Sequence, residues 1–101
     1  MQKQRWRERL AEGRIVTATQ EELLELLEAA EVLSDQDTLV AGHLRVLDLS
    51  GLILVQEETP EGQLLVRRAE SVEAAQALVA DRLATYERMW DGCGCKVDYF
   101  G

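Results

Sequence analysis

Residues 51–90 constrain the fold most, because they have the pattern of a β-hairpin followed by a helix. Two aliphatic runs, at residues 52–55 and 64–66, flank a polar turn. Pro60 presets φ for an early turn position, and Gly62 can take the left-handed conformation that closes such a loop. The sequence therefore predicts two antiparallel strands joined by a four- or five-residue connection.

A long amphipathic helix is expected directly after the hairpin, over residues 72–90. Ser71 is suited to cap its N-terminus, and Gly92 can adopt the αL conformation just past its end. Apolar side chains recur at spacings of three and four and form one stripe of this helix: Val72, Ala75, Val79, Leu83, Tyr86 and Trp90. We expect this stripe to cover one face of the sheet.

Two shorter helices are predicted before the hairpin. Residues 2–12 place Trp6 and Leu10 on one side of a helix. Thr19 and Glu22 have the spacing of a capping box and begin a second helix, whose buried stripe is expected to comprise Leu23, Leu26, Leu27, Ala30 and Leu33. Residues 34–37 read as a polar break. The predicted fold is α+β: a small antiparallel sheet packed against about three helices, in one domain over residues 1–101.

Residues 39–49 leave two architectures open. As a strand, the segment alternates Leu44 and Val46 with Arg45 and completes a three-stranded meander with the hairpin. As a helix, it places Val40, Leu44 and Leu47 on one stripe, with Gly51 just past its end. The β-branched and aliphatic content, followed by an antiparallel hairpin, favours the strand.

The helical alternative carries a family resemblance. His43-Leu-Arg-Val-Leu47, then Ser-Gly-Leu-Ile at residues 50–53 and a hairpin, resembles a winged-helix recognition helix running into its wing, as in small bacterial repressors of the ArsR kind. The resemblance covers roughly residues 38–68 and implies a DNA-binding transcriptional regulator. Charge opposes that function, because Arg45 is the only formal cation of residues 34–49 and the wing would carry three glutamates. Nucleic acid is therefore not an expected partner.

The chain is acidic, with a net charge of −8, but the charge is unevenly placed. Residues 1–14 hold a net +3 and the remainder a net −11. The basic N-terminal helix or arm consists of Lys3, Arg5, Arg7, Arg9 and Arg14. Either this arm folds back on the acidic surface or is solvated, which is the usual role of a charge run, or it meets phosphate or an acidic partner. We favour the first explanation.

A cytoplasmic location is expected. No apolar run approaches the ~18 residues of a membrane span, and the N-terminus lacks the apolar stretch of a signal peptide. Two cysteines one residue apart do not make a secreted disulfide framework. Abundant Leu, Glu, Arg and Ala without asparagine suit a heat-adapted source.

Catalytic and metal-binding signatures are sparse, so neither an enzyme nor a cofactor is expected. His43 is the only histidine, and no nucleophile elbow or phosphate-binding glycine loop occurs. The Cys93-Gly-Cys95 motif allows three interpretations. A redox pair is opposed by the helix C-terminus and by Asp91, which disfavour thiolate. A zinc site would need His43 and Asp98, or a second copy across a dimer axis. A structural C-terminus is the favoured interpretation.

Residues 91–101 form a Cys/aromatic tail that, with the end of the long helix, predicts an interface. Its apolar side chains are those of Met89, Trp90, Tyr99 and Phe100. Such a patch mediates association when it is not buried internally, and small domains often complete their cores by pairing. The expected function is a non-enzymatic protein-interaction or self-associating domain, here as a homodimer. A winged-helix regulator and a thiol redox or metal-binding protein are the alternatives.

Overall fold

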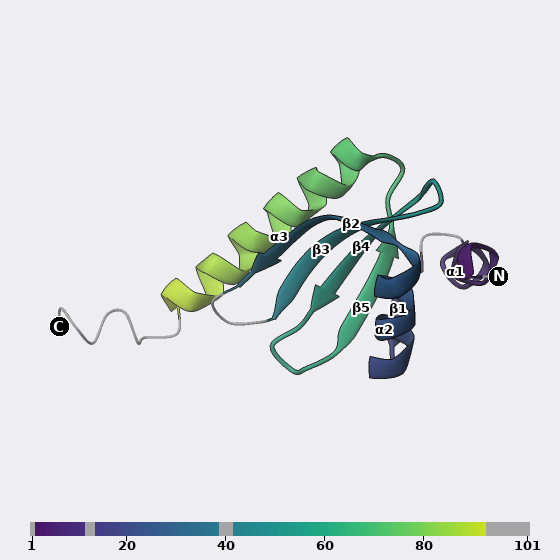
Figure 1. The fold of residues 1–101 in the computed structure, drawn as a ribbon. Coiled ribbons are helices and arrows are strands. Elements are labelled where there is room, and N and C mark those ends of the chain that lie inside the picture. The colour runs from purple at the N-terminus through teal and green to yellow at the C-terminus, as the bar shows by residue number, and fades with distance from the viewer. Residues whose placement is uncertain (1, 12–13, 39–41, 93–101) are drawn as a thin grey trace, which may run out of the picture.

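The computed structural model describes residues 2–11, 14–38 and 42–92, which form three helices and five strands (Figure 1). In chain order these are α1 (Gln2–Arg9), β1 (Val16–Ala18), α2 (Gln20–Ala29), β2 (Glu31–Asp37), β3 (His43–Leu49), β4 (Leu52–Glu58), β5 (Leu64–Arg68) and α3 (Val72–Gly92). The strands make one antiparallel sheet in the order β1-β5-β4-β3-β2, so β1 and β2 are its edges. The predicted α+β class is confirmed.

Helices cover both faces of the sheet, which gives the molecule two hydrophobic cores. Figure 1 shows the long α3 running diagonally along the sheet, apart from α1 and α2. On the α3 face the core contains Leu44, Val46, Val55, Ala75, Val79 and Tyr86. The opposite face is packed against α1 and α2 by Trp6, Leu10, Leu26, Leu47, Leu54 and Val66, among others. Side chains of the central strands therefore alternate between two cores, which explains why β3 and β4 are apolar on both faces.

The hairpins follow the local chemistry of their turns. Ser50 and Gly51, between β3 and β4, have φ values of 52° and 93°, and a two-residue type I′ connection requires positive φ at both positions. Gly62 has a φ of 88° in the β4–β5 turn, where the Gln63 N–H donates to Thr59 Oγ1 at 3.0 Å. The connection comprises five residues, 59–63, in agreement with the prediction of four or five.

The N-terminal caps of α2 and α3 form as predicted, whereas Gly92, expected just past the end of the long helix, is the last residue of α3. Glu22 N–H donates to Thr19 Oγ1 at 3.1 Å and Thr19 N–H donates to Glu22 Oε1 at 3.0 Å, which completes the capping box. Ser71 Oγ accepts from Ala74 N–H at 3.1 Å and caps α3.

Among the helices that the structure describes, none combines the length and apolar character that a membrane span requires.

Residues 31–37 form strand β2, so the prediction of a longer second helix followed by a polar break is wrong. The helix ends at Ala29, and Ala30 is already extended with φ −102° and ψ 157°. Leu33 leaves the expected buried stripe and lies at an irregularity in the β2–β3 register, 38% exposed. The polar composition fits an edge strand, whose side chains can face solvent on both sides.

Residues 43–49 are strand β3, so the helical alternative for residues 39–49 is wrong, and residues 39–41 lie outside the described chain. Leu44 and Val46 face one core while Leu47 and Leu49 face the other. The segment that the winged-helix resemblance needs as a recognition helix is thus a central strand. The predicted meander is present as β3-β4-β5, and β1 and β2 extend it on either side in the described chain.

Candidate functional site

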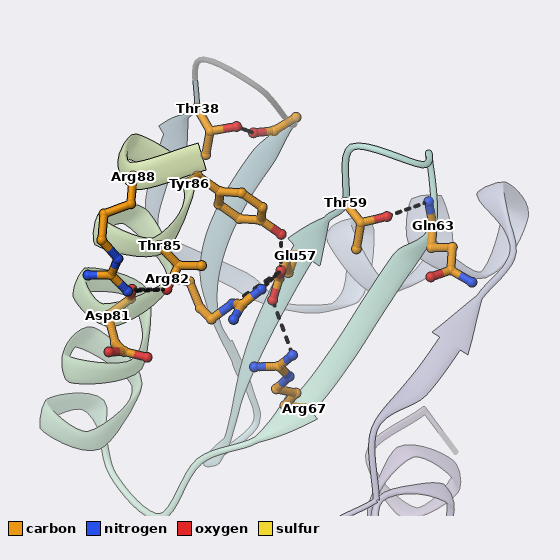
Figure 2. Close-up of polar contacts among 11 residues, drawn as sticks. Thr38, Glu57, Thr59, Gln63, Arg67, Asp81, Arg82, Thr85, Tyr86 and Arg88 are labelled. Carbon is orange, nitrogen blue, oxygen red and sulfur yellow. Dashed lines mark hydrogen bonds and ion pairs between the residues drawn. The ribbon is translucent and has the colours of Figure 1, made fainter. Parts of the chain in front are cut away.

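A buried carboxylate on β4 holds α3 against the sheet. The Glu57 side chain is fully buried on the α3 face. Its Oε2 accepts hydrogen bonds from Arg82 Nη2 at 3.0 Å, from Arg82 Nε at 3.3 Å and from the Tyr86 hydroxyl. Arg67 Nη2 on β5 lies 3.3 Å from the other oxygen, Oε1. Figure 2 shows the four side chains converging from β4, β5 and α3; we call them the Glu57 cluster.

The electrostatics of this cluster favour a neutral phenol at Tyr86. Burial, and then the hydrogen bond to Glu57, raises the pKa of Tyr86 above its ordinary value. Hydrogen bonds to Tyr86 and Glu57 raise the pKa of Arg82, whose guanidinium also lies 5.2 Å from the centre of the Tyr86 ring. One carboxylate thus faces two guanidinium groups. The arrangement suits a structural latch between helix and sheet, because the carboxylate is occupied by cations of the chain itself.

A groove lies beside this latch, between α3 and the edge strand β2. Ser34 and Gln36 of β2 form one wall, and the opposite wall consists of Gln76, Val79, Ala80 and Leu83 of α3. The groove has a volume of about 250 Å³. Val79, the buried residue of its lining, belongs to the α3 core, while Ala80 and Gln76 are exposed. It therefore combines an apolar floor with polar amide and hydroxyl groups.

The outer edge of β2 borders this groove. β2 pairs only with β3 in the described part of the chain. Its burial pattern is that of an uncovered strand: six of its seven residues are exposed, and Val32 is 44% exposed. An edge strand of this length offers a row of backbone donors and acceptors to another chain.

A charged cluster occupies the opposite face of the same edge. Asp35 Oδ1 lies 2.7 Å from His43 Nδ1, and Asp35 Oδ2 accepts from Arg45 Nε at 3.2 Å. Burial opposes ionisation of Asp35, but these two partners outweigh it and lower the pKa of the carboxyl group. Asp37 lies 3.2 Å from the same His43 nitrogen and keeps a side chain that is 82% exposed. Arg45 also donates to Gln56 Oε1 at 2.7 Å.

Of the residues predicted for a metal or thiol site, the structure describes only His43. His43 lies between Asp35 and Asp37, while Cys93, Cys95 and Asp98 lie outside the described residues. Within the described ranges, no three His, Cys, Asp or Glu side chains are grouped as a metal ion would require. The thiol pair and its chemistry stay a prediction.

The predicted basic arm is folded into the domain at α1. Trp6 and Leu10 are buried in the second core, and Arg9 lies 4.5 Å from the centre of the Trp6 ring. Arg5 and Arg9 both pair with Glu22 of α2, Arg5 at 3.4 Å. Arg5 and Arg9 therefore join the basic arm to one glutamate of the acidic second helix.

Most of the predicted terminal interface lies outside the residues that the structure describes. Met89 is 46% exposed at the end of α3, whereas the side chain of Trp90 and all of Tyr99 and Phe100 are among the residues that the structure does not describe. The homodimer through this end stays a prediction.

Sequence reasoning missed both the Glu57 cluster and the β2 edge. Glu57 is separated from Tyr86 by 29 positions, so no spacing in the sequence links them. The signals available in the sequence were a carboxylate, Glu57, at the end of an aliphatic strand, and Arg82 and Tyr86 spaced four residues apart on one side of the long helix. Comparison with protein-family models, with curated proteins and with solved structures finds no match to this chain.

Proposed function

We propose that this chain is a protein-interaction domain that binds an extended segment of a partner protein as an added strand beside β2. The observation that carries the proposal is that a seven-residue edge strand, unpaired on its outer side within the described residues, lies along a groove. Strand addition of this kind draws affinity from backbone hydrogen bonds and specificity from pockets for alternate side chains. The chain then acts by binding, without a catalytic step.

The backbone of β2 supports this proposal. Just after β2, the Thr38 N–H donates to the Gly42 carbonyl oxygen at 3.2 Å and so points towards the β3 side. Because the direction alternates along an antiparallel strand, Gln36 and Ser34 also direct their backbone groups towards β3. The N–H and C=O groups of Asp35 and Asp37 consequently point to the free edge. These two residues can form a ladder with an incoming strand without losing any bond within the sheet.

The groove supplies the second requirement, a place for a side chain of the added strand. Ser34 and Gln36 project on the α3 face and form its near wall. Side chains of a strand paired with β2 would project on the same face at every second residue, directly between β2 and α3. Main-chain pairing and side-chain insertion can therefore occur together.

An NMR titration tests the proposal. The ¹⁵N-labelled full chain is titrated with three synthetic heptapeptides that carry valine at alternate positions and threonine, lysine or glutamate between them. We expect at least one to bind with a Kd of about 1 mM or tighter, with amide shifts concentrated in β2. The amides of Asp35 and Asp37 should exchange more slowly in the complex.

Two variants at Asp37 distinguish edge pairing from other binding. Asp37→Pro removes an outward N–H, which an edge strand tolerates, while Asp37→Asn keeps that N–H and changes only the side chain. The proline variant should lose more affinity than the asparagine variant. Equal affinities of the two variants, or no shift in β2 with any peptide, would overturn the proposal.

A further inference from the structure

We infer that the segment received by β2 alternates aliphatic and cationic side chains, the aliphatic ones entering the groove and the cationic ones facing Asp35 and Asp37. This inference rests on the proposed strand addition and specifies its partner. It follows from the difference between the two faces of β2, because successive side chains of an added strand point to opposite faces.

The α3 face selects an aliphatic side chain. Val79 and Leu83 provide the apolar floor and wall of the groove, and its volume is about 250 Å³. A dry cavity of roughly 150 Å³ is enough to hold a benzene ring, so a branched aliphatic side chain or methionine fits. The groups at its mouth, Ser34, Gln36 and Gln76, are neutral and add no preference for charge.

The other face selects a cation. Two acidic residues of β2, Asp35 and Asp37, lie on this face, and β2 contains no basic residue. Arg45 is already engaged by Asp35 and Gln56, and His43 lies between the two aspartates. Asp37 is the most solvent-exposed carboxylate of this cluster, with 82% of its side chain accessible. A lysine or arginine opposite this position gains a charge-assisted hydrogen bond.

Charge also argues against a second copy as the occupant. Two β2 edges paired together would bring all their acidic side chains into one ladder, where like charges directly opposite each other are destabilising. The net charge of −8 on each chain adds a longer-range repulsion. A basic extended segment of another protein meets neither obstacle.

The test compares four synthetic heptapeptides on the full chain by isothermal titration calorimetry, with NMR to locate binding at β2. They alternate lysine with valine, threonine with valine, glutamate with valine, and lysine with serine. The lysine–valine peptide should bind about fivefold tighter than the threonine–valine peptide, and the glutamate–valine peptide should bind most weakly among the three that carry valine. Replacing valine by serine should weaken binding about tenfold or more.

Matched variants assign each preference to its face. Asp37→Lys should weaken the lysine–valine peptide about fivefold, while Glu70→Lys makes the same charge change at an exposed position beyond β5 and should leave affinity within about twofold. Ala80→Phe fills the groove and should abolish the preference for valine over serine. Ala77→Phe makes the same substitution on an exposed face of α3 that does not line the groove, and should preserve that preference.

The outcomes separate this inference from the proposed function. Binding at β2 that is indifferent to peptide charge, or that favours glutamate, would overturn the cationic partner and leave strand addition intact. An unaltered valine preference in Ala80→Phe would overturn the role of the groove. A dimer in sedimentation with protected β2 amides would identify a second copy as the occupant and overturn the inference. Absence of any binding at β2 would overturn the proposed function itself.

Discussion

Replacement of Glu57 by glutamine tests whether the buried carboxylate holds α3 on the sheet. The substitution keeps the shape of the side chain but removes its charge. Glu57 Oε2 accepts three hydrogen bonds, two from Arg82 and one from Tyr86, and Arg67 lies beside the other oxygen. A glutamine amide offers only one acceptor oxygen, and its NH2 group is a donor. This NH2 group would therefore face either Arg67 or the pair of Arg82 and Tyr86, which are donors as well.

The expected loss of stability follows from the burial of the partners. Removing one member of a fully buried ion pair destabilises by roughly 3–5 kcal/mol, and hydrogen bonds to charged groups contribute about 1.5–3 kcal/mol each. Here the carboxylate is buried, but Arg82 and Arg67 retain 28% and 18% side-chain exposure and can be partly solvated. We therefore expect a loss of about 2–4 kcal/mol in the free energy of unfolding, with a fall of about 10–20 °C in Tm.

Urea unfolding followed by far-UV circular dichroism measures this loss. Glu61→Gln, which makes the same change in the exposed β4–β5 turn, is the control and should stay within about 0.5 kcal/mol of the parent. A double-mutant cycle with Tyr86→Phe should give a coupling energy of about 0.5–3 kcal/mol. If Glu57→Gln is as mild as Glu61→Gln, or if the cycle shows no coupling, the carboxylate does not hold the helix and the reasoning is refuted.

Three further predictions follow from the structure. Tyr86 should ionise above its ordinary pKa of 10.0, because burial and the hydrogen bond to the Glu57 carboxylate raise its pKa. A spectrophotometric titration of the Tyr99→Phe protein measures this pKa. The stability that Tyr86 contributes is present below pH 10 and is lost as the pH rises through the folded pKa. The pKa of Glu22 is lowered from 4.5, first by the backbone N–H of its helix cap. Its contribution is therefore lost as pH falls through the folded pKa, and Glu22→Gln should flatten the decline of stability in urea unfolding between pH 5 and pH 2. Ser50→Asn should raise stability by roughly 0.5 kcal/mol in thermal unfolding, because asparagine tolerates the positive φ of 52° better than serine.

The parts of the fold that could be predicted are those specified by neighbouring residues. The capping box at Thr19 needs only a glutamate three positions later. The β4–β5 turn likewise requires Gly62 at a positive φ, and its sequence signals this directly. β3 could be predicted only as one of two alternatives, because a short aliphatic run that is buried on both faces has no period to identify it.

The edge strand β2 could not be predicted, for a related reason. An uncovered strand imposes no alternation between apolar and polar side chains, so Ser34 to Asp37 look like a loop. Leu33 then fits the 3.6-residue period of the preceding helix by coincidence. Only pairing with β3, which depends on where the rest of the sheet places that strand, makes the segment extended.

The Glu57 cluster is linked to the groove through α3. Arg82 and Tyr86 are held by Glu57, and Val79 and Leu83, within one turn of them, form the groove wall. The position of this wall relative to β2 is therefore set by ion pairs to a buried carboxylate as well as by apolar packing. If a segment adds to β2 as proposed, a groove held in this way would require little ordering on binding, and the added segment would bear most of the entropic cost of forming the complex.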